Sequence, residues 1–150
     1  MSQALNLNTI LAQAGVKTDE ATGALTTPLH FSTTYQHPEF GQSTGYDYTR
    51  TKNPTRVSLE KTLAAIESAD YALATSSGMS AIVLAFSAFP VGSKVLAVRD
   101  LYGGSFRWFA QAEAEGRFAF TYANTEEELL NKLTEDIDIV YIETPTNPLM

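Results

Sequence analysis

The 150-residue sequence lacks cysteine, is poor in basic residues and contains no long hydrophobic run. Without cysteine it has no disulfide, thiolate metal site or cysteine nucleophile, and we assign no metal site. The 10 Lys and Arg residues are outnumbered by 17 Asp and Glu residues, so the net charge of −7 argues against binding to nucleic-acid phosphates or anionic lipid. No segment approaches the roughly 18–20 apolar residues of a membrane span, and the first residues are unlike a secretory signal. We therefore expect a cytoplasmic protein whose partners include neither nucleic acid nor a membrane.

Hydrophobic residues make up 44% of the chain, which is enough for a packed core. The first 55 residues differ from the rest, because Thr, Ser, Gly, Pro and Tyr are scattered there without a sustained period. Apart from a short helix expected around residues 8–14, this segment is interpreted as an extended arm. An ordered arm of this length needs a surface to lie against, either its own globular body or another subunit.

Regular patterns begin at Asn53, a plausible N-cap followed by Pro54 at the first helical position. Helices are predicted to residue 68, from residue 79 to the stop at Pro90, over 104–115, and from the capping box of Thr125 and Glu128 to residue 133. Strands are predicted over residues 71–74, 94–98, 118–122 and 137–142. The alternation predicts that residues 56–150 form the first part of an α/β domain with a mostly parallel sheet and flanking helices. Ligands of such sheets bind beyond the carboxyl ends of the strands.

Two of the loops at these ends contain residues suited to a phosphate and a planar ring. Ser76-Ser77-Gly78-Met79 leads into a helix, whose free N–H groups and dipole favour a phosphate, although Ser and Gly also cap helices for structural reasons alone. Tyr102 precedes Gly103-Gly104, and its ring could cover a planar ligand or only pack on the surface.

Polar side chains in two further segments could contact the same ligand. Asn147 follows the last strand, and its amide could bind a ligand oxygen or fold back on its own turn. In the arm, Tyr48 and Arg50 would project to the same side of an extended strand, where the planar guanidinium suits a phosphate. An arginine in a loop is more often solvated, so the interpretation as an anion clamp is one of two alternatives.

Four motifs in this order resemble the cystathionine (Cys/Met metabolism) family of fold-type I pyridoxal-phosphate enzymes, and the resemblance covers essentially the whole chain. They are YTRTKNPTR at 48–56, SSGMSAI at 76–82, DLYGGSFR at 100–107 and ETPTNP at 143–148. The resemblance implies that pyridoxal 5'-phosphate is the cofactor.

The resemblance also implies roles for individual residues. Ser77, Gly78 and Met79 would lie at the cofactor phosphate, where Gly78 and Met79 donate backbone N–H groups. Tyr48 and Arg50 would complete that site from a neighbouring subunit of a homodimer or homotetramer. Tyr102 would stack on the pyridine ring and serve as a catalytic group in proton transfer. Asn147 would hold the phenolic oxygen or the substrate carboxylate, and Glu143 would support its loop.

The family's cofactor-binding lysine and two further site residues would lie beyond Met150, so we expect the N-terminal portion of an enzyme, inactive by itself. The implied reaction of the complete protein is elimination or replacement at Cβ or Cγ of sulfur amino acids, by a cystathionine γ-synthase or a cystathionine lyase. The alternatives are an O-acetylhomoserine sulfhydrylase, a methionine γ-lyase, or a non-catalytic fragment.

Overall fold

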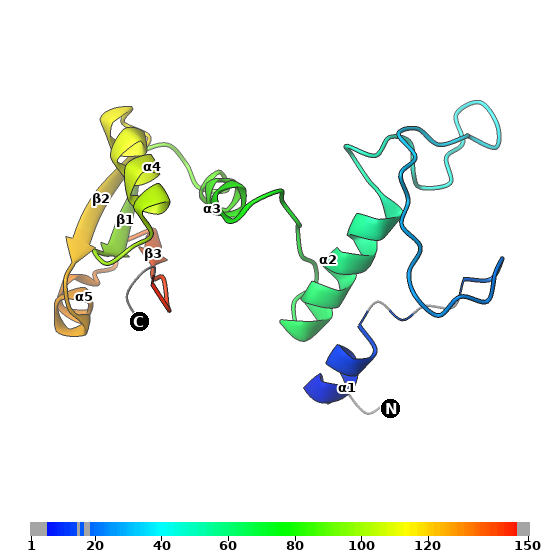
Figure 1. The fold of residues 1–150 in the computed structure, drawn as a ribbon. Coiled ribbons are helices and arrows are strands. Elements are labelled where there is room, and N and C mark those ends of the chain that lie inside the picture. The colour runs from blue at the N-terminus through cyan, green and yellow to red at the C-terminus, as the bar shows by residue number, and fades with distance from the viewer. Residues whose placement is uncertain (1–5, 15, 17–18, 147–150) are drawn as a thin grey trace. The chain divides into compact units, whose positions relative to one another are not determined.

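The computed structural model describes residues 6–14, 16 and 19–146, which divide into two compact units, Met1–Ala74 and Thr75–Met150 (Figure 1). The sequence placed the division after residue 55. It falls after Ala74 because helix α2 (Pro54–Ile66) contacts helix α1 (Leu7–Ala12) and so belongs with the arm. The interpretation of residues 1–55 as an arm that contacts a neighbouring subunit stays a prediction.

Both helices of the first unit begin at asparagine caps. Asn6 accepts the N–H of Asn8, so α1 begins one residue before the expected position and ends at Ala12 instead of residue 14. Asn53 accepts the N–H groups of the first turn of α2 and Pro54 occupies the first turn, as the sequence predicts. This helix ends at Ile66, two residues earlier than expected, because Ser68 has a left-handed φ of 53° that no α-helix can continue.

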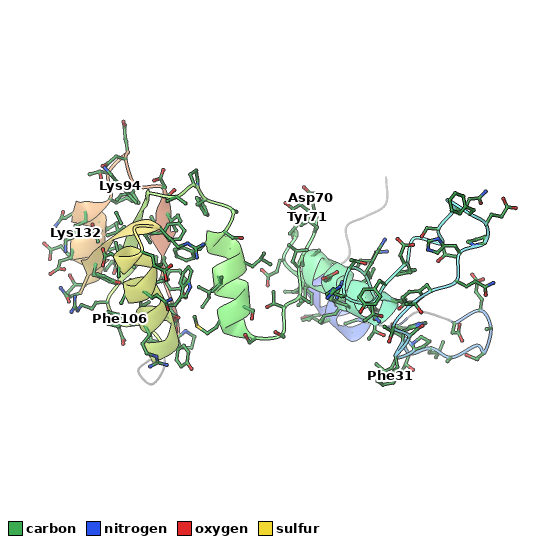
Figure 2. The ribbon with its side chains drawn as sticks, turned by 90° about the horizontal axis from the view of Figure 1, so that it is seen from above. Phe31, Asp70, Tyr71, Lys94, Phe106 and Lys132 are labelled. Carbon is green, nitrogen blue, oxygen red and sulfur yellow. The ribbon has the colours of Figure 1, made fainter. Side chains whose placement is uncertain are left out.

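The arm is folded back on itself, and the Asn53 side chain ties it to α2. Thr34 and Tyr48 form an antiparallel bridge. Nδ2 of Asn53 donates to the carbonyl of His30 at 3.0 Å and to Oγ1 of Thr49 at 3.1 Å. Asn53 is buried, whereas Phe31, which is close to His30 in the arm, is 90% exposed (Figure 2). One asparagine therefore caps a helix and fixes two distant points of the arm.

Replacing Asn53 with alanine should lower the free energy of unfolding by about 1–2 kcal/mol, because α2 loses its cap. Asn53→Asp keeps a capping oxygen but has no amide to donate to His30 and Thr49. It should recover the capping part of the loss and still leave the arm more accessible to protease. Urea unfolding and limited proteolysis of the full-length protein measure the two effects, and equal behaviour of both variants in both assays would contradict the double role.

The second unit contains a parallel three-stranded sheet of order β2-β1-β3. The strands are β1 (Ser93–Val98), β2 (Phe118–Ala123) and β3 (Ile139–Tyr141), and the register places Val95 opposite Phe120 and Ile139. Three of the four predicted strands are thus present, with ends shifted by up to two residues. The predicted fold class, an α/β domain with a mostly parallel sheet and flanking helices, is confirmed.

The strand predicted over residues 71–74 does not form. Residues 71–74 belong to no strand and no ladder. Among the described residues no segment pairs with it, and the N–H of Ala74 donates instead to the Glu60 carboxylate at 3.1 Å. A strand requires a neighbour for its N–H and C=O groups, which the local apolar pattern cannot supply.

The helices of this unit are α3 (Gly78–Phe86), α4 (Gly103–Ala114) and α5 (Glu126–Lys132). Because β2 and β3 flank β1 on opposite sides, the two crossovers run in opposite directions, and right-handed connections then place α4 and α5 on opposite faces of the sheet. Half of the predicted capping box is present: Thr125 accepts the N–H of Glu128, but the Glu128 carboxylate accepts the N–H of Asn124.

Aromatic side chains from α3, α4, β2 and β3 form the core of the second unit. Phe109 of α4 is fully buried and stacks on Phe120 with ring centroids 4.6 Å apart, while the ring of Tyr141 meets it edge-on at 5.0 Å. Phe86 of α3 packs against the same cluster. This packing holds α3 and α4 on one face of the sheet, which fixes where their N-termini lie. In the described part of the chain no helix has the length and apolar character needed to cross a membrane.

Candidate active site

The order of the strands indicates where a ligand would bind in the second unit. β1 and β3 are neighbouring parallel strands, so their carboxyl ends lie side by side at one edge of the sheet. In open α/β sheets ligands bind in the crevice beyond this edge. Tyr102 follows β1 and Glu143 follows β3, and the backbone N–H of Tyr102 donates to Oε1 of Glu143 at 3.1 Å. The two loops are therefore joined at this edge.

The N-terminus of α3, the predicted phosphate cradle, begins at the cap residue Ser77. The hydroxyl of Ser77 accepts the N–H of Ser80 at 3.1 Å, so this side chain serves as the helix cap. Thr75 donates its hydroxyl to the carbonyl of Ser77 and fixes the turn before the helix. The N–H groups of Gly78 and Met79 lie in the first turn, where α-helix geometry provides no acceptor. They are the donors available to an anion, as the resemblance implies.

Tyr102 lies between β1 and α4 and is 41% exposed. Its ring covers Gly104 so closely that a Cβ at that position would lie 2.4 Å from Cε1 of Tyr102. Glycine is thus required at 104 for this position of the ring. The exposed face of the ring is available to a planar ligand.

A buried serine links the phosphate cradle to this tyrosine loop. Ser105 in the first turn of α4 is 0% exposed. Its hydroxyl lies 3.9 Å from Sδ of Met79 and 3.4 Å from Oε2 of Glu143. The structure therefore brings together Met79, Tyr102 and Glu143, which belong to three of the four motifs. Ser105 was missed at the sequence level, although its signal is there: Leu101, Ser105, Phe109 and Ala112 form one buried stripe in which serine is the only polar member.

The hydroxyl of Tyr141 also contacts Oε2 of Glu143, at 3.3 Å. Burial raises the pKa of Tyr141, so the phenol keeps its proton at neutral pH and donates this hydrogen bond. In the same loop Thr146 donates its hydroxyl to Asp100 at 2.8 Å, which joins the end of the loop to the residues after β1. Asn147, the residue expected to offer an amide here, lies outside the described residues.

In the first unit, the structure brings Tyr48 and Arg50 together in a way that differs from the expected extended strand. The N–H groups of Thr51 and Lys52 both donate to the carbonyl of Tyr48 at 3.0 Å, so the chain turns immediately after Tyr48. The guanidinium of Arg50 lies 5.1 Å from the centroid of the Tyr48 ring. Among the described residues no carboxylate forms an ion pair with Arg50. The expected extended strand is thus a turn here, and the role of the two residues at a phosphate stays a prediction.

Arg56, the last residue of the motif at 48–56, was not selected as a site residue, yet it holds this turn in place. Its guanidinium donates to the carbonyls of Thr49 at 3.3 Å and Thr51 at 2.7 Å, on either side of Arg50. Nε of Arg56 also lies 3.5 Å from the Glu60 carboxylate on the same helix. Arg56 therefore supports the turn from α2 and leaves Arg50 available for a ligand.

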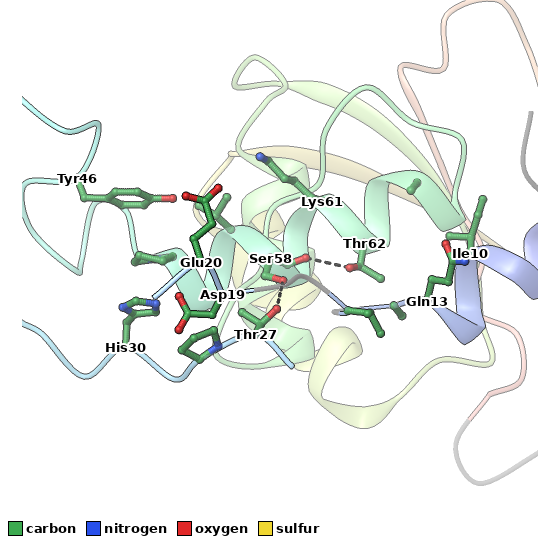
Figure 3. A pocket seen from close by; sticks show the side chains of 16 residues that line it. Ile10, Gln13, Asp19, Glu20, Thr27, His30, Tyr46, Ser58, Lys61 and Thr62 are labelled. Carbon is green, nitrogen blue, oxygen red and sulfur yellow. Dashed lines mark hydrogen bonds between the residues drawn. The ribbon is translucent and has the colours of Figure 1, made fainter. Parts of the chain in front are cut away.

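A pocket of about 910 Å³ lies in the first unit, between α1, α2 and the arm. Figure 3 shows Asp19, Glu20 and His30 at one end of it and Ile10 and Gln13 at the other. None of the site residues expected from the sequence lines it. The pocket thus has no part in the site that the motifs define.

The chemistry of the residues present suits a phosphorylated planar cofactor. In the second unit, two backbone donors at a helix N-terminus suit a phosphate and an exposed tyrosine ring suits an aromatic ring; in the first unit, the guanidinium of Arg50 is a group that suits a phosphate. Within the described ranges no three His, Cys, Asp or Glu side chains are grouped so that they could hold a metal ion. Together with the parallel sheet, these features define the class of α/β proteins that bind a phosphorylated cofactor at the carboxyl edge of the sheet.

The chain belongs to the family of Cys/Met metabolism PLP-dependent enzymes, whose profile matches residues 8–150. PLP, pyridoxal 5'-phosphate, is therefore its cofactor, and its fold is that of the fold-type I PLP enzymes. The resemblance inferred from the four motifs is confirmed.

Two curated relatives and one crystal structure illustrate the similarity. A cystathionine gamma-synthase/O-acetylhomoserine (thiol)-lyase of Bacillus subtilis is 43% identical over all of this chain and 40% of its own length. A cystathionine gamma-lyase of the same organism is 38% identical over 95% of this chain and 38% of its own length. The crystal structure of cystathionine gamma synthase from Xanthomonas oryzae pv. oryzae in complex with cystathionine matches 97% of this chain and 38% of that chain, with a TM-score of 0.87 and 36% identity. The chain spans about 40% of the length of the relatives it matches.

Proposed function

We propose that the protein acts in transsulfuration, as a cystathionine γ-synthase or a cystathionine lyase that eliminates or replaces a group at Cβ or Cγ of a sulfur amino acid. The observation that carries this proposal is the match of residues 8–150 to a family whose similar members are synthases and lyases of cystathionine. The clustering of Met79, Tyr102 and Glu143 around Ser105 supports it from the structure.

The proposed cofactor contacts follow from the geometry of each residue. The N–H groups of Gly78 and Met79 would bind the phosphate, and the Ser77 side chain keeps that helix end open by capping it. Tyr48 and Arg50 would add a hydroxyl and a guanidinium to the same phosphate from a neighbouring subunit. The exposed ring of Tyr102 would lie over the pyridine ring, and the amide of Asn147 would bind the phenolic oxygen or the substrate carboxylate.

PLP supplies an electron sink for amino-acid chemistry when it is bound. The contribution of this chain is to bind and orient it and, at Oη of Tyr102, to transfer a proton. The location of Tyr102 in the loop after β1, at the carboxyl edge of the sheet, supports this proposed role. The position of the lysine that binds the cofactor in this family stays a prediction.

Self-association is proposed on the exposed apolar side chains of the arm. Leu29, Phe31 and Phe40 are all strongly exposed, Phe31 at 90%. Burial of such side chains on a second copy would be favourable, at about 25 cal/mol for each Å² of apolar surface. We therefore expect a homodimer or homotetramer, and a cytoplasmic location stays a prediction.

Titration of the full-length protein with PLP tests whether it is a PLP-dependent enzyme. We expect a visible absorbance band that saturates with the cofactor and disappears when the cofactor is removed by dialysis. A protein that stays colourless at saturating PLP would contradict the proposal and leave the non-catalytic alternative.

Assays with different substrates decide the reaction. Cystathionine, O-acetylhomoserine with cysteine, and methionine are supplied separately and the products identified. Formation of cystathionine from O-acetylhomoserine and cysteine supports a synthase, and its cleavage supports a lyase. A second candidate is an O-acetylhomoserine sulfhydrylase, favoured by the double name of the Bacillus subtilis relative. Cleavage of methionine would instead indicate a methionine γ-lyase.

A further inference from the structure

One carboxylate, that of Glu143, joins the elements that surround the candidate site. Oε1 accepts the backbone N–H of Tyr102 at 3.1 Å. Oε2 accepts the hydroxyls of Ser105 at 3.4 Å and of Tyr141 at 3.3 Å. The donors come from the loop after β1, from the first turn of α4 and from β3. Glu143 is thus the one residue bonded to all three of these elements within the part of the chain that the structure describes.

The position of Glu143 also explains how α4 begins. Tyr102 is the N-cap residue of this 12-residue helix and makes no side-chain capping hydrogen bond. The carboxylate of Glu143, which lies in the loop after β3, bonds to the cap residue and to Ser105 in the first turn. A negative charge at a helix N-terminus is favourable, because the dipole and the free N–H groups are positive there. No Lys or Arg of the described residues forms an ion pair with Glu143, so its carboxylate is held by hydrogen bonds to neutral donors.

The same carboxylate is connected to the phosphate cradle through Ser105. The serine hydroxyl has Glu143 on one side and Sδ of Met79 on the other, at 3.4 Å and 3.9 Å. Because Ser105 is fully buried, water cannot replace either contact easily. A shift of Glu143 would therefore move the Tyr102 backbone directly. It would also change the position of Met79, through the side chain of Ser105.

We propose that Glu143 is the positioning residue of the active site, which holds the Tyr102 ring at the height required for stacking and keeps it in register with the Met79 end of the phosphate cradle. This inference rests on the proposed function. It adds to that function a residue which touches neither the cofactor nor the substrate and which acts through hydrogen bonds to Tyr102 and Ser105.

Variants at Glu143 separate this role from a general contribution to stability. Glu143→Ala removes the acceptor for all three donors. Glu143→Gln keeps an oxygen for the N–H of Tyr102, and its amide can donate to the hydroxyls of Ser105 and Tyr141, which turn to accept. The matched control is Glu113→Ala, because Glu113 also accepts a backbone N–H from another element, that of Phe120, at 3.1 Å. It lies on α4 away from the site loops.

Hydrogen exchange in the cofactor-free full-length protein gives a readout that does not depend on catalysis. The amides of residues 102–106 should exchange about tenfold faster in Glu143→Ala, as expected when a charged hydrogen bond is lost. The Kd for PLP should rise about tenfold, and kcat should fall about tenfold with a smaller change in KM, since a displaced ring affects the reacting geometry. Glu143→Gln should stay within about threefold of the parent in each measurement. Glu113→Ala should leave all three unchanged.

Unchanged exchange at residues 102–106 in Glu143→Ala would overturn the positioning role, whether or not the protein binds PLP. Equal changes in exchange, Kd and kcat for Glu143→Gln and Glu143→Ala would overturn the positioning role as well. The negative charge, and not the hydrogen-bond geometry, would then account for the effect. Failure of the unmodified protein to bind PLP overturns the proposed function instead. That outcome is recognised separately, because the exchange measurement uses no cofactor.

Discussion

The full-length protein with Gly104→Ala should lose about a hundredfold in kcat/KM while its stability stays the same or rises slightly. A Cβ at position 104 would lie 2.4 Å from Cε1 and 3.0 Å from Cδ1 of Tyr102, well inside van der Waals contact. The ring is 41% exposed and can swing outward, so the clash costs the fold little. It moves the ring away from the place proposed for stacking, and a misplacement of about 1 Å at a reacting centre can cost about a hundredfold in rate.

The neighbouring glycine provides the control for this variant. A Cβ at Gly103 would meet only the end of the Arg107 side chain, at 3.3 Å from Nη1, and that side chain can move. Both variants replace a glycine in the first turn of α4, so both gain helix propensity of up to about 1 kcal/mol. Steady-state kinetics and urea unfolding of the two proteins make the comparison. Equal activity of both variants would show that the Tyr102 ring is not held at Gly104 during the reaction.

The fold of the second unit could be predicted from sequence because its signals are local. The apolar runs around Val95, Phe120 and Val140 indicate strands, and the cap at Thr125 marks where a helix begins. The exception, residues 71–74, has the same apolar character but no partner strand among the described residues. Periodicity identifies a segment that suits a sheet, whereas a strand also requires a neighbour elsewhere in space.

The candidate site was only partly predictable, for a related reason. The motif residues Gly78, Met79 and Tyr102 are recognisable because each lies at an element boundary where backbone geometry limits the choice of residue. The contacts of Ser105 with Met79 and Glu143, and the bond of Glu143 to the Tyr102 backbone, join residues 26 to 41 positions apart, which no local pattern records. Family resemblance identifies residues at element boundaries, whereas residues that act through long-range contacts are found only in the tertiary structure.

Asn53 and Arg56 show the same limit in the arm. Asn53 was identified as a helix cap from its position before Pro54, but its bonds to His30 and Thr49 became visible only in the folded chain. No sequence pattern assigns a role to Arg56, yet its hydrogen bonds fix the turn that contains Arg50. Residues that shape a site without touching its ligand are therefore the ones that sequence reasoning finds least often.

Arg50→Ala should weaken PLP binding by the full-length protein about ten- to a hundredfold. The guanidinium lies over the Tyr48 ring at 5.1 Å and forms no ion pair with a described carboxylate, so its donors are available for a phosphate. Removing a charged hydrogen bond of the bidentate kind accounts for a loss of this size. Equilibrium dialysis of the cofactor measures it, and Arg50→Lys should recover part of the affinity because the charge remains but the planar fork does not.

Lys52→Ala is the matched control for Arg50→Ala. Lys52 is a cation two residues further along the same turn, and its Nζ lies 5.2 Å from the centroid of another tyrosine ring, that of Tyr46. Its removal changes the net charge by the same amount and breaks the same kind of contact, but no role at the phosphate is assigned to it. If Arg50→Ala and Lys52→Ala weaken PLP binding equally, the loss reflects the charge of the arm in general. A loss confined to Arg50→Ala assigns the phosphate contact to this side chain, and through it links the arm to the active site.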